Sequence, residues 1–363
     1  MGINDLLPHL PGGGRNEYRQ SFYELGMKGE VVPVDAASAI WQFAARHASD
    51  FLRGNYEPAL TDWVHYLNYL RSICLWDLRV YMDGRVNLDK QPEIERRRIR
   101  AEDAEANNDA IGQIRNTPEY IARAAHVCRF LGIKVYTSAY EADPQVSYAS
   151  IADGLVPQSA DSNILAYGTP GKAIIVKSFL HEWFRVIDPY ADVSHGEYPL
   201  IDLFQDHGII VFRLYAACLG CDFMHIRSGI RGIGYATFVS LADMIEGELT
   251  ARSLGEVIWR EENGIATNEY NNFESEVDIK MHLQSVVDVY SMGRVYDEES
   301  NIIDMSGEQV SAATTLTKQH MTGKVNCRTL ESFSEDLTRE LDKIDVSQLL
   351  HQTASNASNI RGA

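Results

Sequence analysis

The chain has 363 residues, 45% of them hydrophobic, which is enough for one large globular domain or two of medium size. No run approaches the roughly 18 consecutive apolar residues that a membrane-spanning helix needs, so we expect no membrane segment. The first residues have neither a basic start nor a long apolar stretch, so no signal peptide is expected. The net charge is −18, with 51 acidic and 33 basic residues. Taken alone, that charge argues against nucleic-acid binding, because contacts to phosphate supply much of its affinity.

The distribution of charge matters more than its sum, however, and the stretch EIERRRIR at residues 93–100 is locally basic. Five cysteines in a chain of this length favour a reducing, intracellular compartment. Cys218 and Cys221 form a C-x-x-C motif with no second pair, so burial beside a helix is favoured over a metal or redox role.

Apolar, β-branched segments predict four strands, at residues 29–38, 75–84, 131–143 and 171–179. Helical patterns lie between them, at residues 38–52 and 117–133, the second with Pro118 near its start. This alternation of strands and helices predicts an α/β fold with a mainly parallel central sheet flanked by helices.

Acidic residues follow these strands, where α/β sheets place their sites. A lone aspartate is a common turn or N-cap residue, so the set carries more weight than any of its members. The set is Asp35, Asp83, Glu141, Asp143, Asp161 and Asp222. Six converging carboxylates would repel one another unless cations neutralised them, and oxygen ligands favour Mg²⁺ or Mn²⁺. Two such ions about 4 Å apart can catalyse in-line cleavage of a phosphodiester.

The motifs around these acids occur in a familiar order. They are MGINDLLPHL at the start, VVPVDAAS around Asp35, VYMDG around Asp83, YEADPQVSY around Glu141 and Asp143, ADSNILAYG around Asp161, and LGCDFMHIRSGIRGIGYATFVSLA after residue 218. In this order they resemble the flap endonuclease/XPG superfamily of structure-specific 5′ nucleases, in its 5′ exonuclease-like branch, from Met1 to about residue 245.

The resemblance implies a two-metal enzyme, a flap endonuclease or 5′–3′ exonuclease, that hydrolyses phosphodiesters of branched or 5′-ended DNA in repair or replication. By position, Asp35, Asp83 and Glu141 would serve mainly one Mg²⁺ ion. The second ion would be served by Asp143, Asp161, Asn163 and Asp222, and Mn²⁺ could substitute. Lys90 and Arg97 match the basic residues of the first arch helix that steer the scissile phosphate.

The resemblance also implies a surface that binds DNA. Trp41, six residues after Asp35, matches an aromatic that stacks on a nucleobase; ordinary core packing is the alternative. The glycine-rich turn matches one that holds the duplex backbone, usually with K⁺ bound by its carbonyls, although a tight turn between helices also needs glycine. The expected DNA-binding residues are Gly2, Trp41, Arg96, Ser228, Gly229, Arg231, Gly232 and Gly234.

The sequence departs from the family at Asn163, where the family has aspartate. A neutral amide is a weaker donor to Mg²⁺, so we expect a weaker second metal site and an enzyme that is slowed or inactive as written. Because Asp and Asn are nearly isosteric, fold and DNA binding should survive.

The predicted arch, about residues 88–118, is a second departure. Only 58 positions (141 − 83) separate Asp83 from Glu141, fewer than in well-known flap endonucleases. With such a short arch, we do not expect the enzyme to be selective for DNA with a free 5′ flap. Pro92 would place Lys90 just outside the arch helix, so Lys90 and Arg97 need not share a face.

The expected organisation is a nuclease core at 1–245, with a helix–two-turn–helix at about 215–245, and an acidic, mainly helical region at 246–363 packed on it. The family default is a nuclear protein; we expect a monomer and find no sliding-clamp motif. The alternative is a catalytically inactive nuclease-like module that binds nucleic acid, such as RNA, or protein partners.

Overall fold

The computed structural model describes residues 3–12, 21–84, 90–179, 183–223, 229–261, 273–296 and 302–305. Two of the predicted DNA-binding residues, Gly2 and Ser228, lie outside these ranges, as does the end of the predicted C-terminal region after residue 305. In the described part of the chain, no helix combines the length and apolarity needed to cross a membrane.

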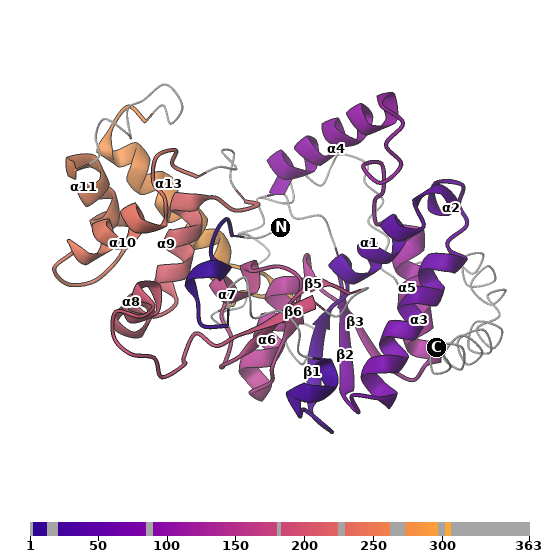
Figure 1. The fold of residues 1–363 in the computed structure, drawn as a ribbon. Helices are drawn as coiled ribbons and strands as arrows, with labels where there is room; N and C mark the ends of the chain where they lie inside the picture. The colour runs from indigo at the N-terminus through magenta and orange to yellow at the C-terminus, as the bar shows by residue number, and fades with distance from the viewer. Residues whose placement is uncertain are drawn as a thin grey trace.

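A six-stranded sheet forms the centre of the molecule (Figure 1). Its strands are β1 (Val31–Asp35), β2 (Asp77–Met82), β3 (Lys134–Thr137), β4 (Gln158–Ser159), β5 (Ala173–Ser178) and β6 (Trp183–Ile187). Their order is β3-β2-β1-β4-β5-β6, and every pairing is parallel except that of β5 with β6. The predicted α/β fold with a mainly parallel sheet is confirmed.

Side chains alternate across the sheet, so a strand can contribute to two hydrophobic cores, one on each face. In β5, Ile174 and Val176 belong to one core, and Ala173 and Ile175 belong to the other. The first core lies under helices that cover one face of the sheet (Figure 1). These helices are α1 (Ala37–Arg46), α2 (Ala48–Leu52), α3 (Glu57–Ser72) and α5 (Pro118–Phe130), with the 3₁₀ turn η2 (Phe22–Leu25).

The two predicted helices of this face are present, with one change. The segment 38–52 is divided at His47, which ends α1 and precedes α2 with a φ of −112°. Helix α5 begins as predicted, because the Thr117 side chain accepts a hydrogen bond from the backbone N–H of Tyr120 and Pro118 occupies the first turn.

The second core continues from the sheet into a group of helices at the other side (Figure 1). They are α6 (Ala142–Asp153), α7 (Asn163–Tyr167), α8 (Pro199–His207), α9 (Ile210–Leu219), α10 (Tyr235–Asp243), α11 (Ala251–Glu261) and α13 (Glu276–Ser291), together with η1 (Leu7–His9). Helix α13 packs against α9, α11 and α7. The proposed boundary at residue 245 therefore does not separate two cores in the described chain.

A short antiparallel pair, β7 (Val295–Tyr296) with β8 (Ile302–Ile303), follows α13. The Gln145 side chain fixes it to α6: its amide N–H donates to the Tyr296 carbonyl at 2.9 Å, and its carbonyl accepts from the Tyr296 N–H at 2.7 Å. Residues beyond the predicted core therefore bond to the same helix that carries Asp143.

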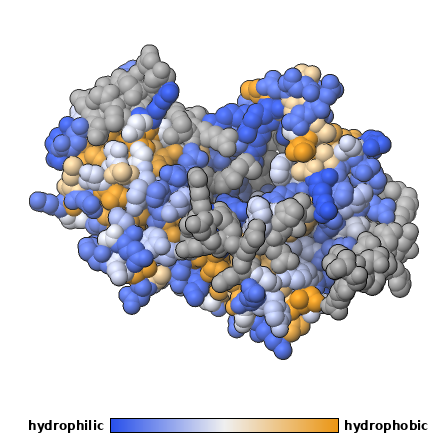
Figure 2. Space-filling model, in the orientation of Figure 1, coloured by the Kyte–Doolittle hydropathy of each residue, from blue (hydrophilic) through white to orange (hydrophobic). Residues whose placement is uncertain are grey.

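Helix α4 (Gln91–Ala106) stands apart from the other helices, above the sheet (Figure 1). Its surface is mainly hydrophilic (Figure 2), as expected for a segment with four arginines in five positions. This helix occupies the predicted arch.

Candidate active site

Two acids lie where β1 and β2 end. Asp35 is the last residue of β1, and Asp83 follows Met82, the last residue of β2. The strands are parallel neighbours, with Asp35 paired to Tyr81, so both carboxylates lie at the same edge of the sheet. The Asp83 carboxylate accepts a hydrogen bond from the Ala142 N–H at 2.9 Å, which joins it to the start of α6.

The start of α6 contributes the next two acids. The predicted strand at 131–143 ends earlier, at Thr137, and Glu141 is the N-cap residue of α6. Asp143 lies in the first turn of that helix. Anionic side chains are favourable there, because the first backbone N–H groups of a helix point toward them.

A serine that the sequence did not single out joins these acids to Asp161. The hydroxyl of Ser159, the last residue of β4, lies 3.1 Å from Asp35 Oδ2 and 3.0 Å from Asp143 Oδ1. The same oxygen accepts a hydrogen bond from the Asp161 N–H at 3.0 Å. Nothing in the local pattern identifies it, because β4 has only two residues.

Burial and mutual repulsion raise the pKa values of five acids in this cluster. Burial, with the charge of Asp83, raises the pKa of Asp35 to about 7. Burial and the charges of Asp35 and Asp161 raise the pKa of Asp143 well above its ordinary range. The pKa values of Asp83, Glu141 and Asp222 are also raised, in each case mainly by burial. The cluster therefore favours a bound cation.

Two basic side chains of the predicted arch reach the cluster. Lys90 is the N-cap residue of α4, and its Nζ lies 2.8 Å from Glu141 Oε2 and 4.6 Å from the ring centre of Phe223. Arg97 Nη2 lies 3.5 Å from Oδ2 of Asp222, which lies three residues after the end of α9. Although Pro92 lies in the first turn of α4, Lys90 and Arg97 both contact the same set of acids.

The cluster also determines the ionisation of Lys90. Burial alone would lower its pKa, but Glu141, Asp222, Asp161 and Asp143 together raise it, so Lys90 carries its charge at neutral pH. A side chain that is buried and still charged is held by the acids around it.

Glu93 is a residue of α4 that sequence analysis missed. Its carboxylate is buried and lies 3.1 Å from Arg96 Nε, 2.9 Å from Arg97 Nε and 2.8 Å from Arg100 Nη2. These arginines follow it at spacings of three, four and seven residues, which place side chains on one face of a helix. That spacing in EIERRRIR is the signal that could have found it.

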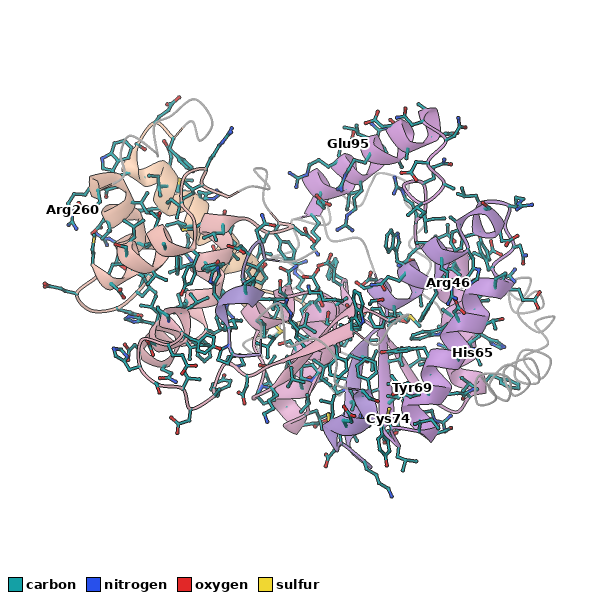
Figure 3. The ribbon with its side chains drawn as sticks, in the orientation of Figure 1. Arg46, His65, Tyr69, Cys74, Glu95 and Arg260 are labelled. Atoms are coloured by element: carbon teal, nitrogen blue, oxygen red, sulfur yellow. The ribbon has the colours of Figure 1, made fainter. Side chains whose placement is uncertain are left out.

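The opposite face of α4 binds nothing in the cluster. Arg98 pairs with Glu95 and Glu102, both exposed, and Figure 3 shows Glu95 on the side of α4 that faces away from the sheet. Arg98 therefore belongs to a solvated face of α4.

Asn163, the position where the family has aspartate, is fully buried as the first residue of α7. Its backbone N–H donates to Asp161 Oδ1 at 3.0 Å, so it lies beside the acidic cluster. Its side-chain oxygen, however, accepts a hydrogen bond from the Tyr290 hydroxyl of α13 at 2.7 Å.

Trp41 lies on α1 and is 38% exposed, which places it outside the core. Its indole N–H donates to the carbonyl of Ile114 at 3.3 Å. The exposed face leaves stacking on a base as a prediction for this residue.

The glycine-rich turn lies between α9 and α10. At two of its positions the backbone conformation requires glycine. A Cβ on Gly229 would lie 2.2 Å from the Cys218 carbonyl oxygen, and Gly229 has a φ of +68°. Gly232 has a φ of +103°. Gly234, the N-cap residue of α10, has a φ of −99°, which any residue adopts, and Arg231 is exposed. The tight-turn interpretation is confirmed for Gly229, and the predicted contact with DNA remains a proposal.

Cys218 and Cys221 are buried, as the favoured interpretation of the C-x-x-C motif expected. Burial raises the pKa of both thiols, that of Cys221 to about 11. Neither thiol is therefore ionised at neutral pH.

The chemistry of the cluster fits a divalent metal with oxygen ligands. Asp35, Asp143 and Asp222 are buried, and burial together with the charges of neighbouring carboxylates raises their pKa values. Within the described ranges, no group of three or more His, Cys, Asp or Glu side chains has its ligating atoms arranged around a common metal position. In this arrangement the charges of Lys90 and Arg97 partly offset those of the acids.

No model of a protein family matches the chain, and no curated protein matches it. Solved structures do match. The catalytic core of Rad2 in complex with DNA substrate is 16% identical, with a TM-score of 0.51 over 89% of this chain and 96% of that one. The Holliday junction-resolving enzyme GEN1, in complex with product DNA and Mg²⁺, is 17% identical, with a TM-score of 0.50 over 93% of this chain and 73% of that one. The chain therefore has the α/β fold of the Rad2 catalytic core and of GEN1.

Proposed function

We propose that this chain is a divalent-metal-dependent, structure-specific 5′ nuclease that hydrolyses phosphodiesters of branched or 5′-ended DNA. The observation that carries the proposal is the convergence of acids from β1, β2, α6 and the segments after β4 and α9 beneath Lys90 and Arg97 of α4. Two structures with the same fold, the Rad2 core and GEN1, were solved in complex with DNA.

In this proposal, Asp35, Asp83 and Glu141 would hold one Mg²⁺ or Mn²⁺ ion, and Asp143, Asp161 and Asp222 would hold the other. Such ions activate a water molecule as the nucleophile and stabilise the leaving oxygen. The Ser159 hydroxyl lies within hydrogen-bond distance of both Asp35 and Asp143, and its single proton orients one of these carboxylates at a time.

Lys90 and Arg97 bind the scissile phosphate and offset its negative charge. Both now pair with acids of the cluster, so binding of metal and substrate requires them to exchange a carboxylate for a phosphate oxygen. Arg97 suits this exchange, because a guanidinium binds carboxylate and phosphate with the same paired N–H groups.

The remaining contacts to DNA are assigned by position. Trp41 stacks on a nucleobase, and the glycine-rich turn binds the duplex backbone with K⁺, without reading sequence. The protein would act as a monomer in DNA repair or replication, in the nucleus, with no sliding clamp bound through a motif in this chain.

Asn163 reduces activity in this account. The second ion loses one negative ligand relative to the family pattern, so it binds more weakly and the rate falls, with complete loss as the limiting case. Fold and DNA binding are kept, because Asn163 is buried and hydrogen-bonded.

The same residue favours a second candidate function. Because the side-chain oxygen of Asn163 already accepts a hydrogen bond from Tyr290, the chain could be an inactive nuclease-like module that binds RNA or protein. Tight binding of single-stranded RNA without binding of flap or duplex DNA, titrated in Ca²⁺, would favour this function.

Cleavage of a 5′-flap DNA labelled on the flap, in Mn²⁺, tests the proposed nuclease. We expect slow release of the flap by the chain as written and its loss in Asp83→Asn, while binding in Ca²⁺ is kept. Asp192→Asn is the matched control, because Asp192 is exposed and lies in the loop between β6 and α8. Equal cleavage by Asp83→Asn and Asp192→Asn would contradict the proposal.

A further inference from the structure

Helices α7 and α13 meet at a buried polar contact beside the acidic cluster. The Tyr290 hydroxyl donates to Asn163 Oδ1 at 2.7 Å, and both side chains are 0% exposed. The two residues are 127 positions apart, so this contact joins the predicted core to the region after residue 245.

Tyr290 has little freedom to release this bond. Its ring packs edge-on against Tyr167, with ring centres 5.0 Å apart, and against Phe223, with ring centres 5.4 Å apart. Because the ring is held by two aromatic neighbours, its position is determined by packing.

The side-chain amide of Asn163 is therefore not arranged to ligate a cation in the cluster, because its oxygen faces Tyr290. Its oxygen accepts a hydrogen bond from the Tyr290 hydroxyl, which uses one of its two lone pairs and holds it toward α13. Its Nδ2 has no free lone pair with which to bind a metal. In the described part of the chain, Nδ2 has no hydrogen-bond partner although it is buried. A metal ligand at this position would present an oxygen to the cluster, whereas this amide turns its oxygen to α13.

We propose that Asn163 is a positioning residue that fastens α13 to α7 through Tyr290, and that it does not ligate the second metal ion. The part of the proposal that concerns the metal rests on the proposed nuclease function; the part that concerns the contact does not. Tyr290, and with it α13, thereby supports the turn that carries Asp161 and the loop that carries Asp222.

A double-mutant cycle in metal-free protein tests the contact. The variants are Asn163→Ala, Tyr290→Phe and the double variant, with thermal unfolding measured in EDTA. We expect each single variant to lower Tm by about 2–4 °C or more, and the double variant to lower it by clearly less than the sum. The matched control is Tyr167→Phe, which removes a hydroxyl from the same aromatic cluster and leaves the Asn163 bond intact; it should lower Tm less than Tyr290→Phe.

Binding of Mn²⁺ to the same variants, measured by electron paramagnetic resonance, tests the metal part. We expect Asn163→Ala to change the Mn²⁺ affinity less than about threefold. An affinity lowered tenfold or more by Asn163→Ala would make Asn163 a ligand and overturn the proposal, as would additive changes in Tm. If Asn163→Ala does not fold, Tyr290→Phe decides: an unchanged Tm in EDTA would overturn the proposal, whereas tighter Mn²⁺ binding on release of the amide oxygen would support it.

These measurements use no DNA, so they test the contact and the metal site independently of whether the protein cleaves DNA. Mn²⁺ binding by none of the variants, including the chain as written, would contradict the metal-dependent nuclease, and the cycle in EDTA would still decide whether Asn163 fastens α13.

Discussion

At the scale of single residues, burial and repulsion act together on Asp35. The carboxylate is desolvated and lies near Asp83 and Asp161, which raises its pKa to about 7. Since the unfolded chain has an ordinary aspartate pKa near 3.8, the folded protein binds this proton more tightly. Asp35 therefore stabilises the metal-free fold below about pH 4, and this contribution is lost as the pH rises through 7.

This linkage predicts opposite effects of pH on the metal-free and metal-bound protein. In EDTA, Tm should fall between pH 5 and pH 8, and Asp35→Asn should flatten that fall because it removes the titrating group. The increase in Tm on adding Mn²⁺ should grow over the same interval, since the ion binds only the ionised carboxylates. A Tm in EDTA that rises steadily from pH 5 to pH 8, measured by circular dichroism, would contradict the electrostatics of the cluster.

The acids were predictable from sequence, and their partners were not. Asp35 and Asp83 follow apolar runs that read as strands, and parallel strands bring such positions to one edge. Ser159 follows no such run, and Tyr290 lies 127 positions from Asn163 within an ordinary amphipathic helix. Pairings of this kind depend on how α13 packs, which local patterns do not record.

At the scale of elements, α4 divides its charges between two faces. Lys90, Glu93 and Arg97 face the cluster, and Arg98 pairs outward with Glu95. Glu93 limits the freedom of Arg97, because one carboxylate oxygen lies 2.9 Å from its Nε while Nη2 contacts Asp222. The helix thus presents Arg97 in one orientation.

Neighbouring arginines of α4 should differ in their effect on catalysis. Arg97→Ala removes a cation from the position of the scissile phosphate, and we expect cleavage to slow about 10²-fold. Arg98→Ala removes only a surface charge paired with Glu95 and Glu102, so the rate should stay within about twofold. Single-turnover cleavage of one flap substrate compares the two, and equal losses would show that α4 contributes only its general positive charge.

Strands were predicted unevenly, for physical reasons. The parallel strands β1, β2 and β5 are apolar, β-branched runs, and the structure places them within the predicted segments. Strand β4 has only two residues, too few to show an alternating pattern. The third predicted strand ends at Thr137, and a loop connects it to Glu141, the N-cap residue of α6. Pro92 is compatible with a helix that begins at Gln91, after the N-cap residue Lys90, because proline is favoured in the first turn.

At the scale of the whole molecule, the region after residue 245 completes a core. Leu254 and Ile258 of α11 and Leu283 and Tyr290 of α13 are buried in the core that also contains Ile175 of the central sheet. Removal of α11 and α13 would expose α9, on which α13 packs. The expected organisation as a nuclease core with a C-terminal region packed on it, and its boundary at residue 245, stay predictions.

Truncation should reveal this dependence. A chain that ends at residue 245 loses the apolar contacts of α11 and α13, and we expect it to aggregate or to unfold at a temperature at least 10 °C lower, since each buried side chain of this size contributes about 1.5–3 kcal/mol. A chain that ends at residue 305 is the control, because it keeps every buried contact named above. A chain of residues 1–245 with an unchanged Tm would contradict the shared core.

We propose that the acidic cluster is a nuclease site whose rate is limited by Asn163. The most direct test compares cleavage of a labelled 5′-flap DNA by the chain as written and by Asn163→Asp, in Mg²⁺ and in Mn²⁺, with binding measured in Ca²⁺. In Asn163→Asp, one carboxylate oxygen can accept the Tyr290 hydrogen bond while the other is available to a metal ion. We predict that cleavage accelerates by orders of magnitude while DNA affinity is unchanged. If both proteins bind the DNA and neither cuts it, the carboxylates do not form a working site, and the chain is a binding module instead.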